Sequence, residues 1–307
     1  MILLTDANGN PDKNYGHQLE QIATEEQSAE GLLRIDYTYR FGIYPDGQQY
    51  TLQVPHYSLI QLSRGPVDQK TIISVRTAPQ LAGVGLIAAI DEQQLFPHVH
   101  ANDEPNSLPP AMLMTRSTST QGGRFGWRAT APTIEHQISA ALERDMGVNP
   151  TVGISRRDFD DLVFYMQNLA VPAMRFTAPG WEGKRLFFTA RCDRCHRESI
   201  EISPWASRPA ITIRPYSDFM LHNMGNDLGD VSVDGNSIVS EWRTAPLWGL
   251  GLVHELNPDA GFLHDGRATT IEHAILWHGG EARDSRNAFV SMTHDQREQL
   301  IKFLMAL

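Results

Sequence analysis

The chain has 307 residues, of which 41% are hydrophobic, and a formal net charge of −10. This length suits two domains of ordinary size, and the hydrophobic fraction is enough to build their cores. The acidic balance argues against nucleic acid as a partner, because neutralising phosphates requires clustered Lys and Arg. The sequence has no run of about 18 apolar residues, so we expect no membrane-spanning helix.

The first element that the sequence predicts is a β-hairpin. Apolar or aromatic residues alternate with polar ones over residues 37–44 and 49–54, and Pro45-Asp46-Gly47 forms a turn signal between them. Two alternating runs joined by such a turn are typical of two paired antiparallel strands.

Residues 91–123 are rich in Pro, Ser and Asn and predict a long loop. His98 and His100 within it have the residue type of metal ligands. No third ligand accompanies them in the sequence, so we interpret the pair as solvent-exposed.

Each half of the sequence ends in a predicted amphipathic helix. Apolar side chains recur at helical spacing over residues 162–169 and again over residues 300–307. The predicted N-terminal caps are Ser155 with Asp158 for the first helix and Thr293 with Gln296 for the second.

An internal repeat organises the chain. The sequence Arg-Thr-Ala-Pro is followed by Gly-x-Gly-Leu in both halves, and Arg-Ala-Thr then leads to Thr-Ile-Glu-His in both. These segments are 76–79, 83–86, 128–130 and 133–136 in the first half, and 243–246, 249–252, 267–269 and 270–273 in the second. We therefore predict two copies of one domain, over residues 1–172 and 173–307.

The only two cysteines of the chain lie in the sequence Cys192-Asp193-Arg194-Cys195-His196. This C-x-x-C-H spacing predicts covalent haem attachment through both thiols. The histidine would be the proximal iron ligand. Half of a zinc site is a weaker interpretation, because no second ligand pair follows. A thioredoxin-like pair is also weaker, because residues 184–190 predict a helix that already runs before the motif.

The first copy lacks this motif. An equivalent one would fall near or before residue 25, where there is no cysteine. The first copy has either lost its haem or been cut upstream. Haem c is attached outside the bacterial inner membrane, so we expect a periplasmic protein whose export signal is not present in this chain. The first residues are too short for the apolar region of such a signal.

Six segments resemble the bacterial di-haem oxidoreductase family, whose members are often labelled thiol oxidoreductases and are similar to di-haem cytochrome c peroxidases. The segments are 15–19, 123–127, 221–225, 241–249, 263–268 and 275–281. The resemblance implies one haem per domain, the N-terminal haem meeting peroxide and the C-terminal haem passing electrons to it. We expect a mainly α fold, with two cytochrome c-like domains in tandem and a small hairpin insertion in the first.

The resemblance places the sixth ligand of the C-terminal haem on the helix that follows His264. Counting along that helix favours His278, and Met224 is the alternative. A histidine at a helix C-terminus is also favoured by the helix dipole alone. Two imidazoles would give a closed, low-spin iron suited to electron transfer, with a lower potential than a His/Met pair.

Arg243 and Arg267 are candidates for binding haem propionates, because guanidinium groups bind carboxylates bidentately. Structural salt bridges are the equally weighted alternative. The His264-Asp265 pair resembles the turn that fixes a loop over the haem in the family. Tryptophan side chains near the site are expected to pack in the core, and these are Trp242, Trp248 and Trp277.

Gln137 and Asp145 resemble the Gln and the acidic residue that lie over the peroxide-binding haem of relatives. An acid at that place moves a proton between peroxide oxygens. Without a first haem the two residues have no substrate, so a solvated helix surface is the default interpretation.

The sequence therefore predicts a c-type haem oxidoreductase that relays electrons through the iron at His196. One alternative is a fragment of a complete di-haem peroxidase or protein-modifying oxidase, and another is a mono-haem sensor without catalysis. The expected partner is a redox protein or a small electron donor. Calcium is a further cofactor that the resemblance implies as possible, although no cluster of ligands in this sequence identifies a site for it.

Overall fold

A computed structural model describes residues 1–22, 28–95, 123–175, 180–204 and 209–307. It is 32% helical and 22% strand, so the expectation of a mainly α fold is wrong. Within the described ranges the strands form five separate two-stranded sheets. Most of these strands have two to four residues, which is too short for an alternating pattern to stand out in a sequence. In two of the short sheets, β1 with β4 and β7 with β10, the partner strand is distant in the chain, so tertiary packing decides the strand state.

The chain divides into two compact units that interleave in the sequence. The first unit comprises residues 1–78, 224–240 and 259–294, and the second comprises residues 79–223, 241–258 and 295–307. The predicted boundary at residue 172 separates two copies of a repeated sequence, whereas these units are defined by contacts within the structure. The boundary therefore stays a prediction.

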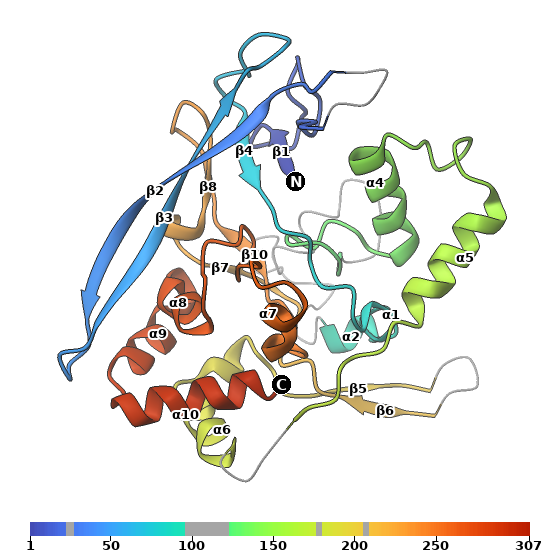
Figure 1. Ribbon diagram of the computed structural model, residues 1–307. Helices are drawn as coiled ribbons and strands as arrows, with labels where there is room; N and C mark the ends of the chain where they lie inside the picture. The colour runs from blue at the N-terminus through green and yellow to red at the C-terminus, as the bar shows by residue number, and fades with distance from the viewer. Residues whose placement is uncertain (23–27, 96–122, 176–179, 205–208) are drawn as a thin grey trace, which may run out of the picture. The chain divides into compact units, whose positions relative to one another are not determined.

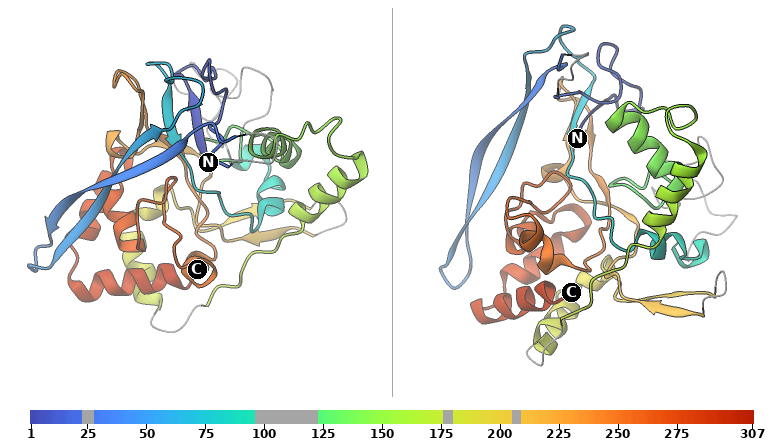
Figure 2. Two further views of the ribbon diagram at one scale, coloured as in Figure 1. Left: turned by 45° about the horizontal axis from the view of Figure 1, so that its top comes forward. Right: turned by 45° about the vertical axis from the view of Figure 1, so that its right-hand side comes forward.

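The first unit is built on the predicted hairpin, which is confirmed and longer than expected. Strand β2 (Leu32–Ile43) pairs with β3 (Gln49–Ile60) over its whole length, and Gly47 takes a positive φ of 88° in the turn. Figures 1 and 2 show this pair as one long ribbon. The other elements of this unit are β1 (Ile2–Thr5), β4 (Ile72–Val75), β8 (Asp230–Val231), β9 (Ile238–Val239), α8 (Ile271–Trp277) and α9 (Arg283–Val290).

The second unit holds the remaining α-helices of the described chain and two short two-stranded sheets, β5 with β6 and β7 with β10. The helices are α1 (Val84–Ala88), α2 (Glu92–Leu95), α4 (Ile134–Met146), α5 (Arg156–Gln167), α6 (Gly180–Thr189), α7 (Val253–Leu256) and α10 (His294–Met305). The strands are β5 (Ile200–Ile202), β6 (Ile211–Ile213), β7 (Leu221–Asn223) and β10 (Glu241–Arg243).

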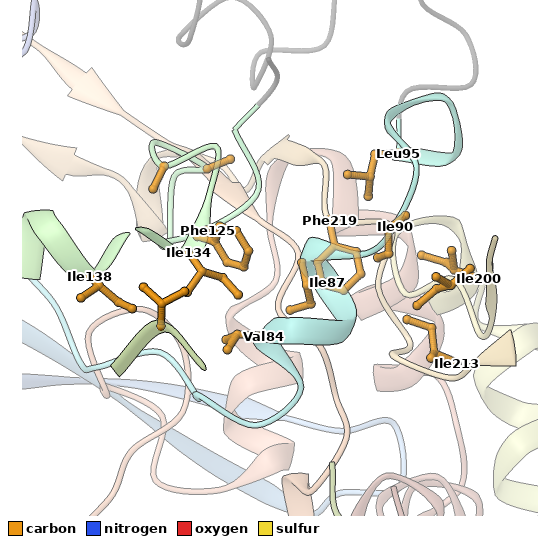
Figure 3. Close-up of a cluster of buried hydrophobic side chains, with 14 of the residues drawn as sticks. Val84, Ile87, Ile90, Leu95, Phe125, Ile134, Ile138, Ile200, Ile213 and Phe219 are labelled. Atoms are coloured by element: carbon orange, nitrogen blue, oxygen red, sulfur yellow. The ribbon is translucent and has the colours of Figure 1, made fainter. Parts of the chain in front are cut away.

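A cluster of buried apolar side chains forms the core of the second unit. Val84 and Ile87 of α1 pack with side chains from α4, from the β5–β6 pair and from the segment before β7, and Figure 3 shows Phe219 beside Ile87. The predicted helix at residues 162–169 is the end of α5, and Ser155 caps α5 by accepting a hydrogen bond from the Asp158 amide. This core holds the elements that carry the candidate site.

The repeated Gly-x-Gly-Leu segment has the same local geometry in both halves. The Gly83 amide donates to the Leu169 carbonyl, and the Gly249 amide donates to the Leu307 carbonyl. The second glycine of each motif lies so close to the end of a helix that a Cβ would collide with a carbonyl oxygen. Gly85 meets Gln167 at the end of α5, and Gly251 meets Met305 at the end of α10.

The second repeated segment also recurs, but with a different register from the one expected. Residues 125 and 131 form a β-bridge, as do residues 262 and 268, and the following threonines cap α4 and α8. Ala129 and Gly266, both with positive φ, are therefore equivalent. Arg128 corresponds to Asp265 and not to Arg267, so the alignment of the two Arg-Ala-Thr triplets is wrong. The β-bridges and the helix caps fix this register, in which the two triplets are offset by two residues.

Candidate functional site

The C-x-x-C-H motif forms a tight turn directly after α6. Leu186 and Phe187 are buried within this helix and Ala190 directly after it, which confirms the helix predicted before the motif. Arg191 then adopts a left-handed conformation with φ of 61°, and residues 192–194 form one 3₁₀ turn. The His196 amide donates to the Cys192 carbonyl at 2.9 Å. The turn thus brings both sulfur atoms and the imidazole into one short stretch of backbone.

The His196 ring is held by the backbone on one side. Its Nδ1 lies 2.9 Å from the Tyr216 carbonyl oxygen. A carbonyl accepts only, so Nδ1 carries a proton, and in the neutral ring the lone pair is then on Nε2. The Phe187 ring lies edge-on at 6.4 Å and limits rotation of the imidazole. Anchoring of one ring nitrogen in this way is typical of a histidine that offers the other to a metal.

The two cysteines are free thiols and both are half-buried. Burial, with a smaller contribution from Asp193, raises the pKa of Cys192 to about 12. A redox-active pair of the thioredoxin type needs a thiol whose pKa is lowered. The environment of Cys192 does the opposite, which argues against that interpretation.

A pair of side chains that the sequence did not predict lies at the second cysteine. Asp218 lies on the segment between β6 and β7, and His222 lies in β7; their ligand atoms and the Cys195 sulfur are all within 4.8 Å of one another. The His222 Nε2 is 2.8 Å from an Asp218 carboxylate oxygen. Burial opposes the charge on His222, but hydrogen bonds to Asp218 and Cys195 prevail and raise the pKa of His222 to about 11. An Asp and a His four residues apart give no signal of this proximity.

Arg243 is a buried cation in the same unit. Its Nε donates to the Gly126 carbonyl at 2.8 Å, and its Nη1 is 3.3 Å from the Thr244 carbonyl. Within the described part of the chain it forms no salt bridge with a carboxylate. Burial lowers the pKa of Arg243 to about 10, and the nearby charge of Asp218 opposes the shift only in part. A buried guanidinium without an anion is costly, so this site favours an anionic group from outside the chain.

Arg267 differs, because it already has its carboxylate. Its guanidinium lies 2.7 Å from Asp265, which also accepts a hydrogen bond of 2.7 Å from the Tyr57 hydroxyl. The guanidinium stacks over the Trp277 ring at 4.9 Å. These contacts lie within the first unit and match the structural salt bridge that the sequence left as an alternative. The adjoining His264 turn is held by the Thr77 amide, which donates to the His264 carbonyl.

His278 belongs to the first unit, where it caps the end of α8. Its Nδ1 lies 2.7 Å from the Ala274 carbonyl, the same kind of anchor that His196 has. Burial lowers the pKa of His278, so the ring is neutral at pH 7 and suited to metal ligation. The alternative ligand Met224 lies next to it, because a Cβ on Gly279 would be 2.8 Å from the Met224 carbonyl oxygen. His196 is in the second unit, so its pairing with either residue stays a prediction.

The structure does not bring Gln137 and Asp145 together. Both lie on α4, eight residues or about 12 Å apart along the helix axis. Gln137 is half-buried with its side-chain oxygen near Gly126, whereas Asp145 is exposed. The exposed position of Asp145 is that of a solvated helix surface.

The three tryptophans are buried, as expected of core residues. Arg128 stacks over Trp242 at 4.5 Å. The indole nitrogens of Trp248 and Trp277 have no hydrogen-bond partner among the residues that the structure describes. His98 and His100 lie outside those residues.

Comparisons with known proteins give a family. The sequence model of the family described as "Di-haem oxidoreductase, putative peroxidase" matches residues 149–307. No curated protein matches the chain. A solved structure of Kuenenia stuttgartiensis hydrazine synthase, pressurized with 20 bar xenon, is similar at a TM-score of 0.40 and 18% identity. The alignment covers 58% of this chain and 63% of that one, which is less than two thirds of its length. None of the helices described is long and apolar enough to cross a membrane.

Proposed function

The chain belongs to the di-haem oxidoreductase family and has a haem-based redox role, and on this premise we propose that it is a c-type haem electron-transfer protein. We propose that one haem is attached through Cys192 and Cys195 and that His196 is its proximal ligand. When bound, the haem supplies one-electron redox chemistry at its iron.

The anchor on His196 is the observation that carries this proposal. With Nδ1 bonded to the Tyr216 carbonyl, the imidazole presents Nε2 in a fixed tautomer. The turn that contains His196 also contains both thiols, as covalent attachment requires. The residues present therefore fit a haem c.

Arg243 supports the same assignment from another element. Its buried guanidinium has hydrogen bonds to carbonyl oxygens and lacks a carboxylate among the described residues. A propionate is the anion that a haem brings, and a guanidinium binds a carboxylate strongly. We propose Arg243 as the propionate ligand, while Arg267 is already paired with Asp265.

For the sixth iron ligand we propose His278, with Met224 as the alternative. The neutral, carbonyl-anchored imidazole of His278 has the chemistry of a ligand. A second histidine would leave no open position on the iron, which suits electron relay rather than substrate chemistry.

The wider roles follow from the family and are proposals as well. We propose that the protein works in the periplasm with a redox protein or a small electron donor. A peroxidase-like activity would require a second haem, and residues 1–307 contain only one C-x-x-C-H motif. In such an assembly Gln137 and Asp145 would be the residues to test for proton transfer.

The test is the absorption spectrum and intact mass of the chain expressed with an export signal and haem c maturation machinery. We expect a mass increase of one haem and a low-spin spectrum. Cys192→Ala should lower the fraction of the chain that carries covalent haem. His278→Ala should give a high-spin spectrum, whereas the exposed His136→Ala serves as the matched control and should leave it unchanged.

Each other result has a definite meaning. A chain without covalent haem refutes the assignment, and zinc uptake by that chain would make Cys195, Asp218 and His222 a metal site instead. A spectrum that stays low-spin in His278→Ala but becomes high-spin in Met224→Ala would make Met224, and not His278, the sixth ligand.

A further inference from the structure

Three arginines are interleaved with the haem-attachment motif. Arg191, Arg194 and Arg197 follow one another at intervals of three residues, and all three are exposed. Cys192, Cys195 and His196 lie between them. Positive charge is therefore concentrated on the surface at the point where the cofactor would be bound.

These arginines differ from the basic residues around them, which are neutralised. Lys184 lies 2.6 Å from Glu198, and Arg185 lies 2.6 Å from Glu182. By contrast, Arg191, Arg194 and Arg197 form no ion pair with any residue that the structure describes. The one acidic side chain inside the motif, Asp193, is half-buried. The charge of the three guanidinium groups is thus directed at solvent.

The whole chain has the opposite sign, with a formal net charge of −10. A local patch of one sign on a protein of the other sign orients an approaching charged partner. Such a patch raises the rate of productive encounters and suppresses binding in other orientations. The partner that this patch would attract is acidic where it makes contact.

Two large aromatic side chains are exposed on α6, the helix that precedes the motif. Trp181 is 65% exposed and Phe188 is 38% exposed, although both are large apolar groups. The Lys184 ammonium lies 5.8 Å from the first ring and 5.9 Å from the second. Exposed aromatic rings combined with arginine are the composition that is enriched at protein interfaces.

We propose that this arginine surface docks an acidic electron-carrier protein against the haem site. The surface comprises Arg191, Arg194 and Arg197 with Trp181 and Phe188. The inference rests on the proposed function, because it assigns the partner of that same site. One electron leaves the reduced carrier and is gained by the haem iron, and no bond forms or breaks. Docking at the attachment turn keeps the path between the two redox groups short.

The test uses the haem-loaded chain and a plant-type [2Fe–2S] ferredoxin as the acidic carrier. Stopped-flow absorption gives the second-order rate constant for haem reduction by reduced ferredoxin. In Arg191→Glu/Arg197→Glu we expect this rate constant to fall at least about tenfold at low salt. About 0.5 M salt should lower the wild-type rate to a similar value, because it screens exposed charges.

The matched control is Arg156→Glu/Arg157→Glu on α5, which changes the net charge by the same amount in the same unit. Both arginines are highly exposed. We expect a change of less than about twofold. An equal loss in both variants would show that only net charge matters and would overturn the proposal. An unchanged rate in Arg191→Glu/Arg197→Glu would also overturn it.

Two further readouts separate this proposal from the proposed function. Excess dithionite should reduce the haem to the same final extent in every variant, which shows that the site itself is intact. Equilibrium binding of oxidised ferredoxin, measured by calorimetry, requires no electron transfer and should weaken at least about tenfold in Arg191→Glu/Arg197→Glu. Covalent haem with no ferredoxin binding refutes the docking surface alone, whereas absence of haem refutes the proposed function.

Discussion

The His222 Nε2 lies 2.8 Å from a carboxylate oxygen of Asp218, beside the second cysteine of the C-x-x-C-H motif. The backbone reinforces this placement, because the Asp218 amide donates to the Cys195 carbonyl at 2.8 Å. An ion pair thus lies at the thiol that would become a thioether. If a haem is bound there, the charges of this pair would act electrostatically on the cofactor near Cys195.

The stability that this pair contributes depends on pH. Burial lowers the pKa of His222, but the hydrogen bonds to Asp218 and Cys195 raise it to about 11, above the usual 6.5. A raised pKa in the folded state gives stability that is fully present below pH 6.5 and is lost as the pH rises toward 11. Between these limits, the free energy of unfolding should fall by about 2 kcal/mol more in wild type than in Asp218→Asn.

Urea unfolding at a series of pH values measures this difference. Asp193→Asn is the control, since it removes a neighbouring carboxylate that has no hydrogen bond to His222, and it should keep the wild-type pH dependence. Equal slopes for wild type and Asp218→Asn would mean that His222 is not held as a cation. Repeating the series in Cys195→Ala shows how much of the effect comes from the thiol.

Replacing Arg243 should affect the haem-loaded and haem-free proteins differently. In the haem-free chain, Arg243→Met removes a buried charge together with its hydrogen bonds to carbonyls, and these effects largely cancel. With haem attached, the variant would also lose the proposed contact to a propionate. We expect the haem-loaded form to lose about 2 kcal/mol more stability than the haem-free form.

The measurement is thermal and urea unfolding of both forms, with Cys192→Ala/Cys195→Ala as the haem-free background. Arg267→Met is the comparison, because it breaks a salt bridge internal to the chain and leaves Asp265 buried. It should destabilise both forms alike, by about 3 to 5 kcal/mol. A loss that is the same in both forms of Arg243→Met would assign Arg243 to folding alone.

The close contacts of two glycines in the repeat predict that alanine substitution at these positions lowers stability. A Cβ at Gly251 would lie 2.1 Å from the Met305 carbonyl oxygen, and one at Gly85 would lie 1.9 Å from that of Gln167. Because the obstacle is backbone, the helix ends must move, and each Ala variant should lose about 3 kcal/mol of stability. Gly147→Ala meets no atom within 4 Å but has a φ of +64°, so it should lose only about 1 kcal/mol.

Chemical denaturation of the three glycine variants provides the comparison. If Gly251→Ala and Gly85→Ala were no less stable than Gly147→Ala, the close approach of the motif to the two helix ends would be refuted. Similar losses at Gly251 and Gly85 would instead support a shared architecture in the two repeats.

The sequence alone determined the features that depend on neighbouring residues. The hairpin follows from alternation around Pro45-Asp46-Gly47, and the cap of α5 follows from Ser155 three residues before Asp158. The C-x-x-C-H turn is likewise encoded in five consecutive residues. Such features are readable because local backbone preferences and short-range hydrogen bonds fix them.

Tertiary structure alone decided what depends on residues far apart in the chain. The small sheets pair strands too short to show a pattern, and this overturned the mainly α expectation. Folding brings Asp218 and His222 to Cys195 and distinguishes the buried Arg243 from Arg267, which has a carboxylate partner. Two arginines have the same chemistry in a sequence, and only the groups that folding places around them give Arg267 a carboxylate partner and leave Arg243 with carbonyl partners alone among the described residues.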